Sequence, residues 1–163
     1  MTSFDHLQAP LDADMEKQRA ELADIIRRVT TDDGNYATAV DSLFMSRYSK
    51  SHDFASVLAQ PALCIMAQGR KEVRLSDEIF NYDPLNYLVV SVSMPLSGRV
   101  VNVTSEEPIL AVRLDIDPAE ITALIADAGL VRHVVEPRVE RGAVRDHAMV
   151  HLVHAGVQTG ASR

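Results

Sequence analysis

Residues 64–95 read CIMAQGRKEVRLSDEIFNYDPLNYLVVSVSMP, and this stretch decides the fold class because it holds several short β-strands together with their turns. An apolar run ends at a glycine turn at 68–71, and residues 72–75 then alternate charged with apolar side chains, which predicts a hairpin. Further turns are expected at 76–77 and 83–86. Strands this short and this close together are typical of a small antiparallel barrel or a jelly roll.

Two helices and further strands are expected outside this stretch. Residues 11–29 place their apolar side chains on one side of a helix, with an aspartate at position 12 or 14 as the N-cap. Such a helix more often covers its own core than it binds a partner, so we expect it to pack on the barrel. A second helix is predicted to begin at Pro118, capped by Asp117, and to end at Gly129. The additional strands are expected at 37–48, 54–58, 99–104 and 109–115.

The pattern is weaker after residue 131. Residues 132–145 are basic and contain Pro137 and Gly142, so a loop is expected there. Residues 144–155 could form one more helix, and residues 156–163 are expected to be a frayed tail.

The stretch that decides the fold class also resembles the N-terminal domain of AraC-type bacterial transcriptional regulators. The resemblance covers roughly residues 40–128, and its elements are fairly specific as a set. The matching elements are Gln68-Gly69-x-Lys71, the Asp77 turn, Tyr82-Asp83-Pro84, residues 87–92, Pro95, Glu107-Pro108 and Leu114-Asp115. The resemblance implies a cupin-like domain for effector sensing and dimerisation, normally followed by a DNA-binding domain with paired helix-turn-helix units.

We therefore expect an α+β protein with a cupin-like antiparallel β-barrel of the jelly-roll type and flanking helices. Its parts would be an N-terminal helix and loop at 1–35, the barrel with the following helix at 36–129, and a weakly structured C-terminal segment at 130–163. The chain stops before a helix-turn-helix pair could fit, so we expect either an excised piece or a natural short protein.

The length and the net charge of the chain exclude several classes of function. A chain of 163 residues suffices for one domain with a sizeable core, and its net charge of −7 argues against direct contact with nucleic acid. The single cysteine, Cys64, excludes an internal disulfide and suits a reducing cytosol. Neither a signal peptide nor an apolar run near the ~20 residues of a membrane span occurs, so a cytoplasmic protein without membrane contact is expected.

Metal binding and catalysis are not expected. Cupin enzymes hold metal with histidines on adjacent barrel strands, but no histidine occurs between His52 and His133. The C-terminal histidines at helical spacing, which more often form a solvated surface, are His147, His151 and His154. No Gly-x-Ser-x-Gly elbow or phosphate-binding glycine loop is present, and Cys64 in an apolar strand should be inert. We predict no catalytic residue, no metal ligand and no cofactor.

A ligand pocket is the remaining candidate site. Along residues 87–93 one face is purely apolar, with Leu88, Val90 and Val92, while the other mixes a ring with small hydroxyls. The mixed face suits a small organic effector, although a barrel filled by its own side chains is equally common. With a pocket present, the apolar face would pack as core, and the lining candidates are Met66, Tyr82, Tyr87, Ser91 and Met94. A structural role at turns is expected for Gly69, Lys71 and Pro84.

The resemblance and the pocket together favour one function. We expect the effector-sensing and dimerisation domain of an AraC-type regulator, a homodimer without its DNA-binding half and without enzymatic activity. One alternative is a small cupin-fold enzyme, such as an isomerase or a dioxygenase, which would show bound metal or turnover. Another is a dimerisation module that binds no ligand.

Overall fold

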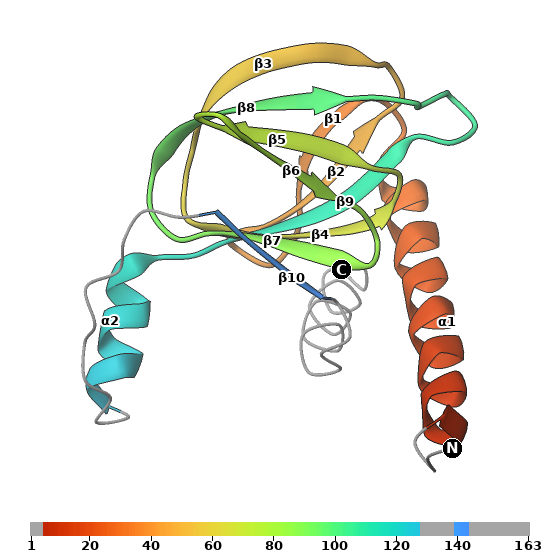
Figure 1. Ribbon diagram of the computed structural model, residues 1–163, viewed down its shortest axis with the longest axis horizontal. Coiled ribbons are helices and arrows are strands. Elements are labelled where there is room, and N and C mark those ends of the chain that lie inside the picture. The colour runs from red at the N-terminus through yellow and green to blue at the C-terminus, as the bar shows by residue number, and fades with distance from the viewer. Residues whose placement is uncertain (1–4, 128–138, 144–163) are drawn as a thin grey trace.

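The computed structural model describes residues 5–127 and 139–143, which form two antiparallel β-sheets and two helices (Figure 1). The helices are α1 (Asp5–Val29) and α2 (Pro118–Asp127). A six-stranded sheet, called sheet A here, has the order β1-β2-β9-β4-β7-β10, and a four-stranded sheet B has the order β3-β8-β5-β6. The strands are β1 (Gly34–Ala37), β2 (Leu43–Tyr48), β3 (His52–Ala59), β4 (Ala62–Gln68), β5 (Lys71–Leu75), β6 (Glu78–Tyr82), β7 (Asn86–Val90), β8 (Met94–Val100), β9 (Ile109–Asp115) and β10 (Val139–Ala143).

Sheet A separates two hydrophobic cores. Alternate residues of β4, such as Leu63 and Ile65, pack in the core that contains α1, while Met66 packs in the core between the sheets. The same alternation holds in β9, where Leu110 belongs to the α1 core and Ile109 to the core between the sheets. Both faces of the central strands are therefore buried, which explains why their sequences are apolar almost throughout.

Helix α1 covers one face of sheet A with its C-terminal half, as expected. Its buried side chains there are Leu22, Ala23, Ile25 and Ile26, and Ile26 is fully inaccessible to solvent. The helix ends at Val29, and the backbone N–H and hydroxyl of the next residue, Thr30, both donate to the carbonyl of Ile26, at 2.9 and 2.7 Å. The expected N-cap at position 12 or 14 is wrong, because α1 already begins at Asp5.

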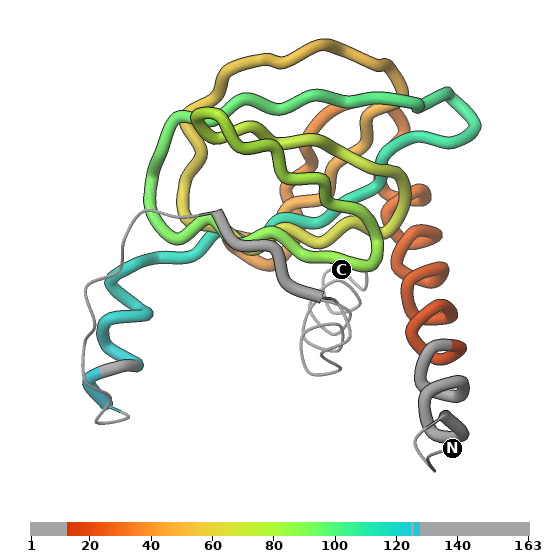
Figure 2. The backbone as a smooth tube through the Cα atoms, viewed as in Figure 1, coloured from red at the N-terminus to blue at the C-terminus, as the bar shows by residue number. Residues whose placement is uncertain are grey.

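The chain crosses between the sheets at Gly69, where a hairpin was expected. Strand β4 pairs with β7 and β9 in sheet A, whereas β5 pairs with β6 and β8 in sheet B. Gly69 has φ of 89°, and a Cβ atom there would lie 2.8 Å from Cγ1 of Ile109. Only glycine allows this left-handed turn against β9, and the crossing is visible along the backbone trace in Figure 2.

The other turns of the stretch at 64–95 lie where they were predicted. Residues 76–77 connect β5 to β6 in a hairpin, with Ser76 at φ of 52°. Asp83 closes the next turn, since its Oδ1 accepts from the backbone N–H of Leu85 at 3.0 Å and the amide of Asn86 at 2.9 Å. This second turn again carries the chain from one sheet to the other.

Two further expectations differ from the structure. Residues 37–48 were expected to form one strand, but the end of β1 and all of β2 lie there, joined by a turn with Ser42 at φ of 71°. The segment 132–145, expected as a loop, contains β10, which pairs with β7 at the edge of sheet A. The helix expected at 144–155 lies outside the described residues, and the proposed division at residues 35 and 129 stays a prediction.

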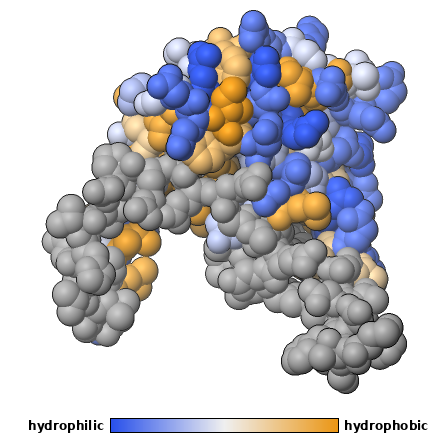
Figure 3. Space-filling model, in the orientation of Figure 1, coloured by the Kyte–Doolittle hydropathy of each residue, from blue (hydrophilic) through white to orange (hydrophobic). Residues whose placement is uncertain are grey.

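Helix α2 begins as predicted. Asp117 caps it, because its Oδ1 accepts from the backbone N–H of Ala119 at 2.8 Å. Its apolar side chains remain accessible among the described residues, with Ile121 43% and Leu124 64% exposed, and apolar side chains are visible on this helix in Figure 3. Neither described helix is long and apolar enough to span a membrane.

Candidate functional site

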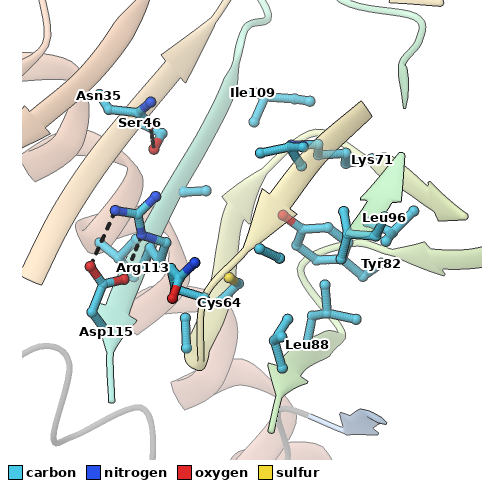
Figure 4. A pocket seen from close by; sticks show the side chains of 18 of the residues that line it. Asn35, Ser46, Cys64, Lys71, Tyr82, Leu88, Leu96, Ile109, Arg113 and Asp115 are labelled. Atoms are coloured by element: carbon cyan, nitrogen blue, oxygen red, sulfur yellow. Dashed lines mark hydrogen bonds and ion pairs between the residues drawn. The ribbon is translucent and has the colours of Figure 1, made fainter. Parts of the chain in front are cut away.

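A cavity of about 300 Å³ lies between the two sheets (Figure 4). Both sheets contribute side chains to its wall, and apolar residues alternate with polar groups around it. The apolar lining includes Val73, Leu88, Val90, Leu96, Ile109 and Ala111. The polar lining includes Asn35, Ser46, Tyr48, Gln60, Cys64, Lys71, Tyr82, Arg113 and Asp115.

Strand alternation brings these residues together. Ala62 and Cys64 of β4 point to the same face, and their register partners in β9 are Asp115 and Arg113. On the other side of β4, Cys64 lies opposite Leu88 of β7. Since residues two apart in a strand share a face, three neighbouring strands of sheet A supply one continuous wall.

Lys71 and Tyr82 form the polar part of the opposite wall. They are direct register partners in the β5–β6 hairpin, so their side chains leave the same face of sheet B. The Lys71 ammonium lies 5.8 Å from the ring centroid of Tyr48, on the facing sheet. Among the described residues it has no hydrogen bond and no ion pair. Burial lowers the pKa of Lys71, because the charged form loses its hydration.

Tyr82 is buried, with only 6% of its surface exposed, and its hydroxyl points into the cavity (Figure 4). Burial also raises the pKa of this phenol, which therefore stays neutral. No hydrogen-bond partner for the hydroxyl exists among the residues that the structure describes. Tyr82 thus offers the cavity a donor that the protein itself leaves unused.

The polar groups on sheet A are largely satisfied by one another. Arg113 forms an ion pair with Asp115, with 2.7 Å between Nε and Oδ1. Asn35 Oδ1 accepts from the hydroxyls of Ser46, at 2.6 Å, and Tyr48, at 3.1 Å. These contacts hold the lining side chains in fixed positions without using Lys71 or Tyr82.

Cys64 faces the cavity between the Arg113–Asp115 ion pair and Tyr82 (Figure 4). Burial raises the pKa of its thiol to about 11. The thiol is therefore protonated at neutral pH, which makes it a weak nucleophile. The described residues contain no group of three His, Cys, Asp or Glu side chains that could hold a metal ion.

The cavity suits binding better than chemistry. Apolar walls supply burial for an organic molecule, and a few placed polar groups fix its orientation. Within the described part of the chain, no base is hydrogen-bonded to Cys64, and the hydroxyls of Ser46 and Tyr48 are committed to Asn35. The arrangement can hold a small molecule through Lys71 and Tyr82.

The structure brings only one of the five predicted ligand-binding residues to the cavity wall, namely Tyr82. Met66 and Met94 are buried in the core between the sheets, beside the lining residues. Tyr87 packs in the α1 core on the other face of sheet A, and Ser91 lies between β7 and β8. Whether any of the five contacts a ligand stays a prediction.

The expected orientation of β7 is the reverse of the observed one. Leu88 and Val90, predicted to pack away from the pocket, line the cavity, while Tyr87 and Val89 pack on the α1 side. The sequence could not orient this strand because apolar cores lie against both of its faces. Lys71 was assigned a structural role at a turn, although its alternation with buried Val73 places both side chains on the inner face.

Comparison with known proteins assigns a family to this barrel. A sequence profile of the AraC-type transcriptional regulator N-terminus matches residues 39–158, well over half of the chain. The chain belongs to this family. The resemblance recognised over roughly residues 40–128 is confirmed. Curated proteins yield no match.

Solved structures agree with the AraC-type fold. Unsaturated fatty acid-bound ToxT from Vibrio cholerae is similar with a TM-score of 0.51 and 9% identity, over 79% of this chain and 49% of ToxT. Apo ToxT K231A gives a TM-score of 0.50 and 7% identity, over 76% of this chain and 49% of ToxT. The chain therefore spans about half the length of ToxT, and at this identity the likeness shows the fold alone.

Proposed function

We propose that this AraC-type domain binds a small organic effector in the cavity between its sheets and forms a homodimer. The observation that carries the proposal is the mixed lining of the cavity, where apolar walls surround the Lys71 ammonium and the Tyr82 hydroxyl. The bound state would favour one arrangement of the attached DNA-binding domains over another. Such a shift requires the effector to bind the two arrangements with different affinities.

Size and the structural neighbour indicate the kind of effector. The volume of about 300 Å³ lies at the lower end of small-molecule sites, which span ~300–1,000 Å³. ToxT, with the same fold, has been solved with an unsaturated fatty acid bound. We infer a ligand of related amphipathic character but small enough for this cavity.

Strand pairing supplies a route from the cavity to the C-terminal part of the chain. Leu88 and Val90 line the cavity, and their register partners in β10 are Arg141 and Val139. A ligand that displaces β7 would therefore also displace β10, because backbone hydrogen bonds join the two strands. This connection supports a domain that transmits its ligand occupancy toward an attached DNA-binding domain.

The remaining features support regulation over catalysis. The raised pKa of Cys64 makes its thiol a poor nucleophile, and the matched family consists of regulators. We propose that the domain performs no reaction on its effector. A role in transcription would place it in the cytoplasm.

A thermal-shift screen of small metabolites tests the proposal. At least one compound should raise the Tm of the wild-type protein, since a ligand that binds only the folded state stabilises it. Ala111→Leu should abolish the shift, because Ala111 lines the cavity and a larger side chain would occupy the ligand's place. Ala126→Leu on exposed α2 is the matched control and should respond like the wild type.

Two results would contradict the proposal. A broad library without any stabiliser, together with a tight dimer in sedimentation, would favour a dimerisation module that binds no ligand. Compounds that stabilise Ala111→Leu as strongly as the wild type would place their site outside the cavity.

A further inference from the structure

We propose that the effector is an organic anion, a carboxylate with a short apolar body, and that Lys71 is its anchor. This inference rests on the proposed function and specifies its ligand class. It starts from the charges that line the cavity, which are Lys71, Arg113 and Asp115. Arg113 and Asp115 neutralise each other, with 2.7 Å between their charged atoms, so Lys71 remains as the uncompensated charge.

The described neighbours of Lys71 do not supply a counter-charge. Cys64 and Tyr82 would be negative only when deprotonated, and burial raises the pKa of both groups. Tyr48 offers the face of its ring at 5.8 Å, close to the ~6 Å limit of a cation–π contact. On a protein with a net charge of −7, the cavity thus carries a local positive charge.

The Lys71 side chain is half-buried, and an ammonium that loses part of its hydration without gaining a hydrogen-bonded partner is costly. Among the described residues, no carboxylate, carbonyl or hydroxyl accepts a hydrogen bond from Lys71. An anion in the cavity would provide this acceptor and would gain a charge-assisted bond in a region of low dielectric constant. Lys71 therefore fits a binding site in which the ligand supplies the missing hydrogen-bond acceptor.

Tyr82 is placed to share the same anion. It is the cross-strand partner of Lys71, and its buried hydroxyl points into the cavity without a described acceptor (Figure 4). One ammonium and one phenol hydroxyl match the two oxygens of a carboxylate. Leu88, Val90 and Leu96 lie further along the wall and would contact the apolar body.

The test compares acids with their uncharged counterparts by isothermal titration calorimetry at neutral pH. Octanoate and hydrocinnamate, each beside its primary amide, would be titrated into the wild-type protein. The acids should bind about tenfold or more tightly than the amides, because a hydrogen bond to a charged group is stronger than a neutral one. Lys71→Met should remove this preference, and Tyr82→Phe should reduce it.

Lys50→Met is the matched control, since Lys50 is exposed and does not line the cavity, and it should keep the full preference. The Tm of each variant reports whether the fold is intact. Lys71→Arg, which retains the cation, should keep the preference for acids if Lys71→Met has lost it through charge and not through misfolding.

Equal binding of acids and amides, or an acid preference that survives in Lys71→Met, would overturn this inference. Neutral or cationic stabilisers in the metabolite screen, with no binding of the acids, would overturn it while leaving the proposed effector site in place. Failure of every charge class to bind would contradict the proposed function itself.

Discussion

Burial within the cavity shifts the pKa values of individual side chains. Cys64 is the clearest case, since desolvation raises the pKa of its thiol to about 11 even though the nearby cations Lys71 and Arg113 act in the opposite direction. The effect of lost hydration exceeds the attraction of the two positive charges, because neither the ammonium nor the guanidinium is hydrogen-bonded to the sulfur. The residue contributes shape and polarisability to the cavity wall, not reactivity.

The thiol should therefore react slowly with iodoacetamide in the folded state. At pH 8 the thiolate fraction should be about 100-fold lower than for an ordinary cysteine, because the pKa rises from 9.0 to about 11. The rate should rise with pH until about pH 11, as the sign of the shift requires. Mass spectrometry of the alkylated protein measures it, and the urea-unfolded chain provides the reference rate. Equal rates in folded and unfolded protein would contradict the buried environment.

Helix α1 shows how an element stabilises the barrel from outside. Its contact residues belong to a core separated from the cavity by sheet A, so the helix supports the cavity wall without touching a ligand. This arrangement favours a covering helix over a partner-binding helix, at least for its C-terminal half.

Replacing Ile26 by alanine should lower the free energy of unfolding by about 2–5 kcal/mol, because the change leaves a cavity under sheet A. Urea denaturation followed by circular dichroism measures the change. Val29→Ala is the control, since Val29 is 41% exposed on the same helix and should cost less than about 1 kcal/mol. A similar small loss for both variants would mean that α1 is not part of the folded core.

The whole molecule is acidic, with 23 Asp and Glu residues against 16 Lys and Arg residues. A protein that binds duplex DNA neutralises phosphates with clustered cations, and a net charge of −7 opposes this. The local positive charge of the cavity comes from Lys71 alone among the described lining residues, and a single cation is not a phosphate-binding cluster. We therefore expect DNA contact by an AraC-type regulator to be made outside this domain.

This chain alone should not bind duplex DNA within the ~10⁻⁴–10⁻⁶ M range of non-specific binding at physiological salt. Fluorescence anisotropy of a labelled duplex tests this expectation, with polylysine as the positive control. Micromolar binding that weakens as salt increases would show a phosphate-binding surface and would contradict the division of roles between domains.

The fold class, the family and the position of most strands can be predicted from the sequence, because the turns at Asp77 and Asp83 and the cap at Asp117 depend on nearby side chains. These signals act within a few residues, so they can be recognised without knowing the rest of the chain.

Which residues meet in the cavity depends on contacts between distant segments and could not be predicted from the sequence. Gly69 was recognised as a turn, but whether the chain reverses or crosses to the other sheet depends on the distant pairing of β4 with β9. The orientation of β7 likewise depends on the core that contains α1, because Tyr87 and Val89 pack half-buried against that core while Leu88 and Val90 face the cavity. A strand that packs against apolar cores on both faces carries no polar side by which its sequence could reveal the inner one.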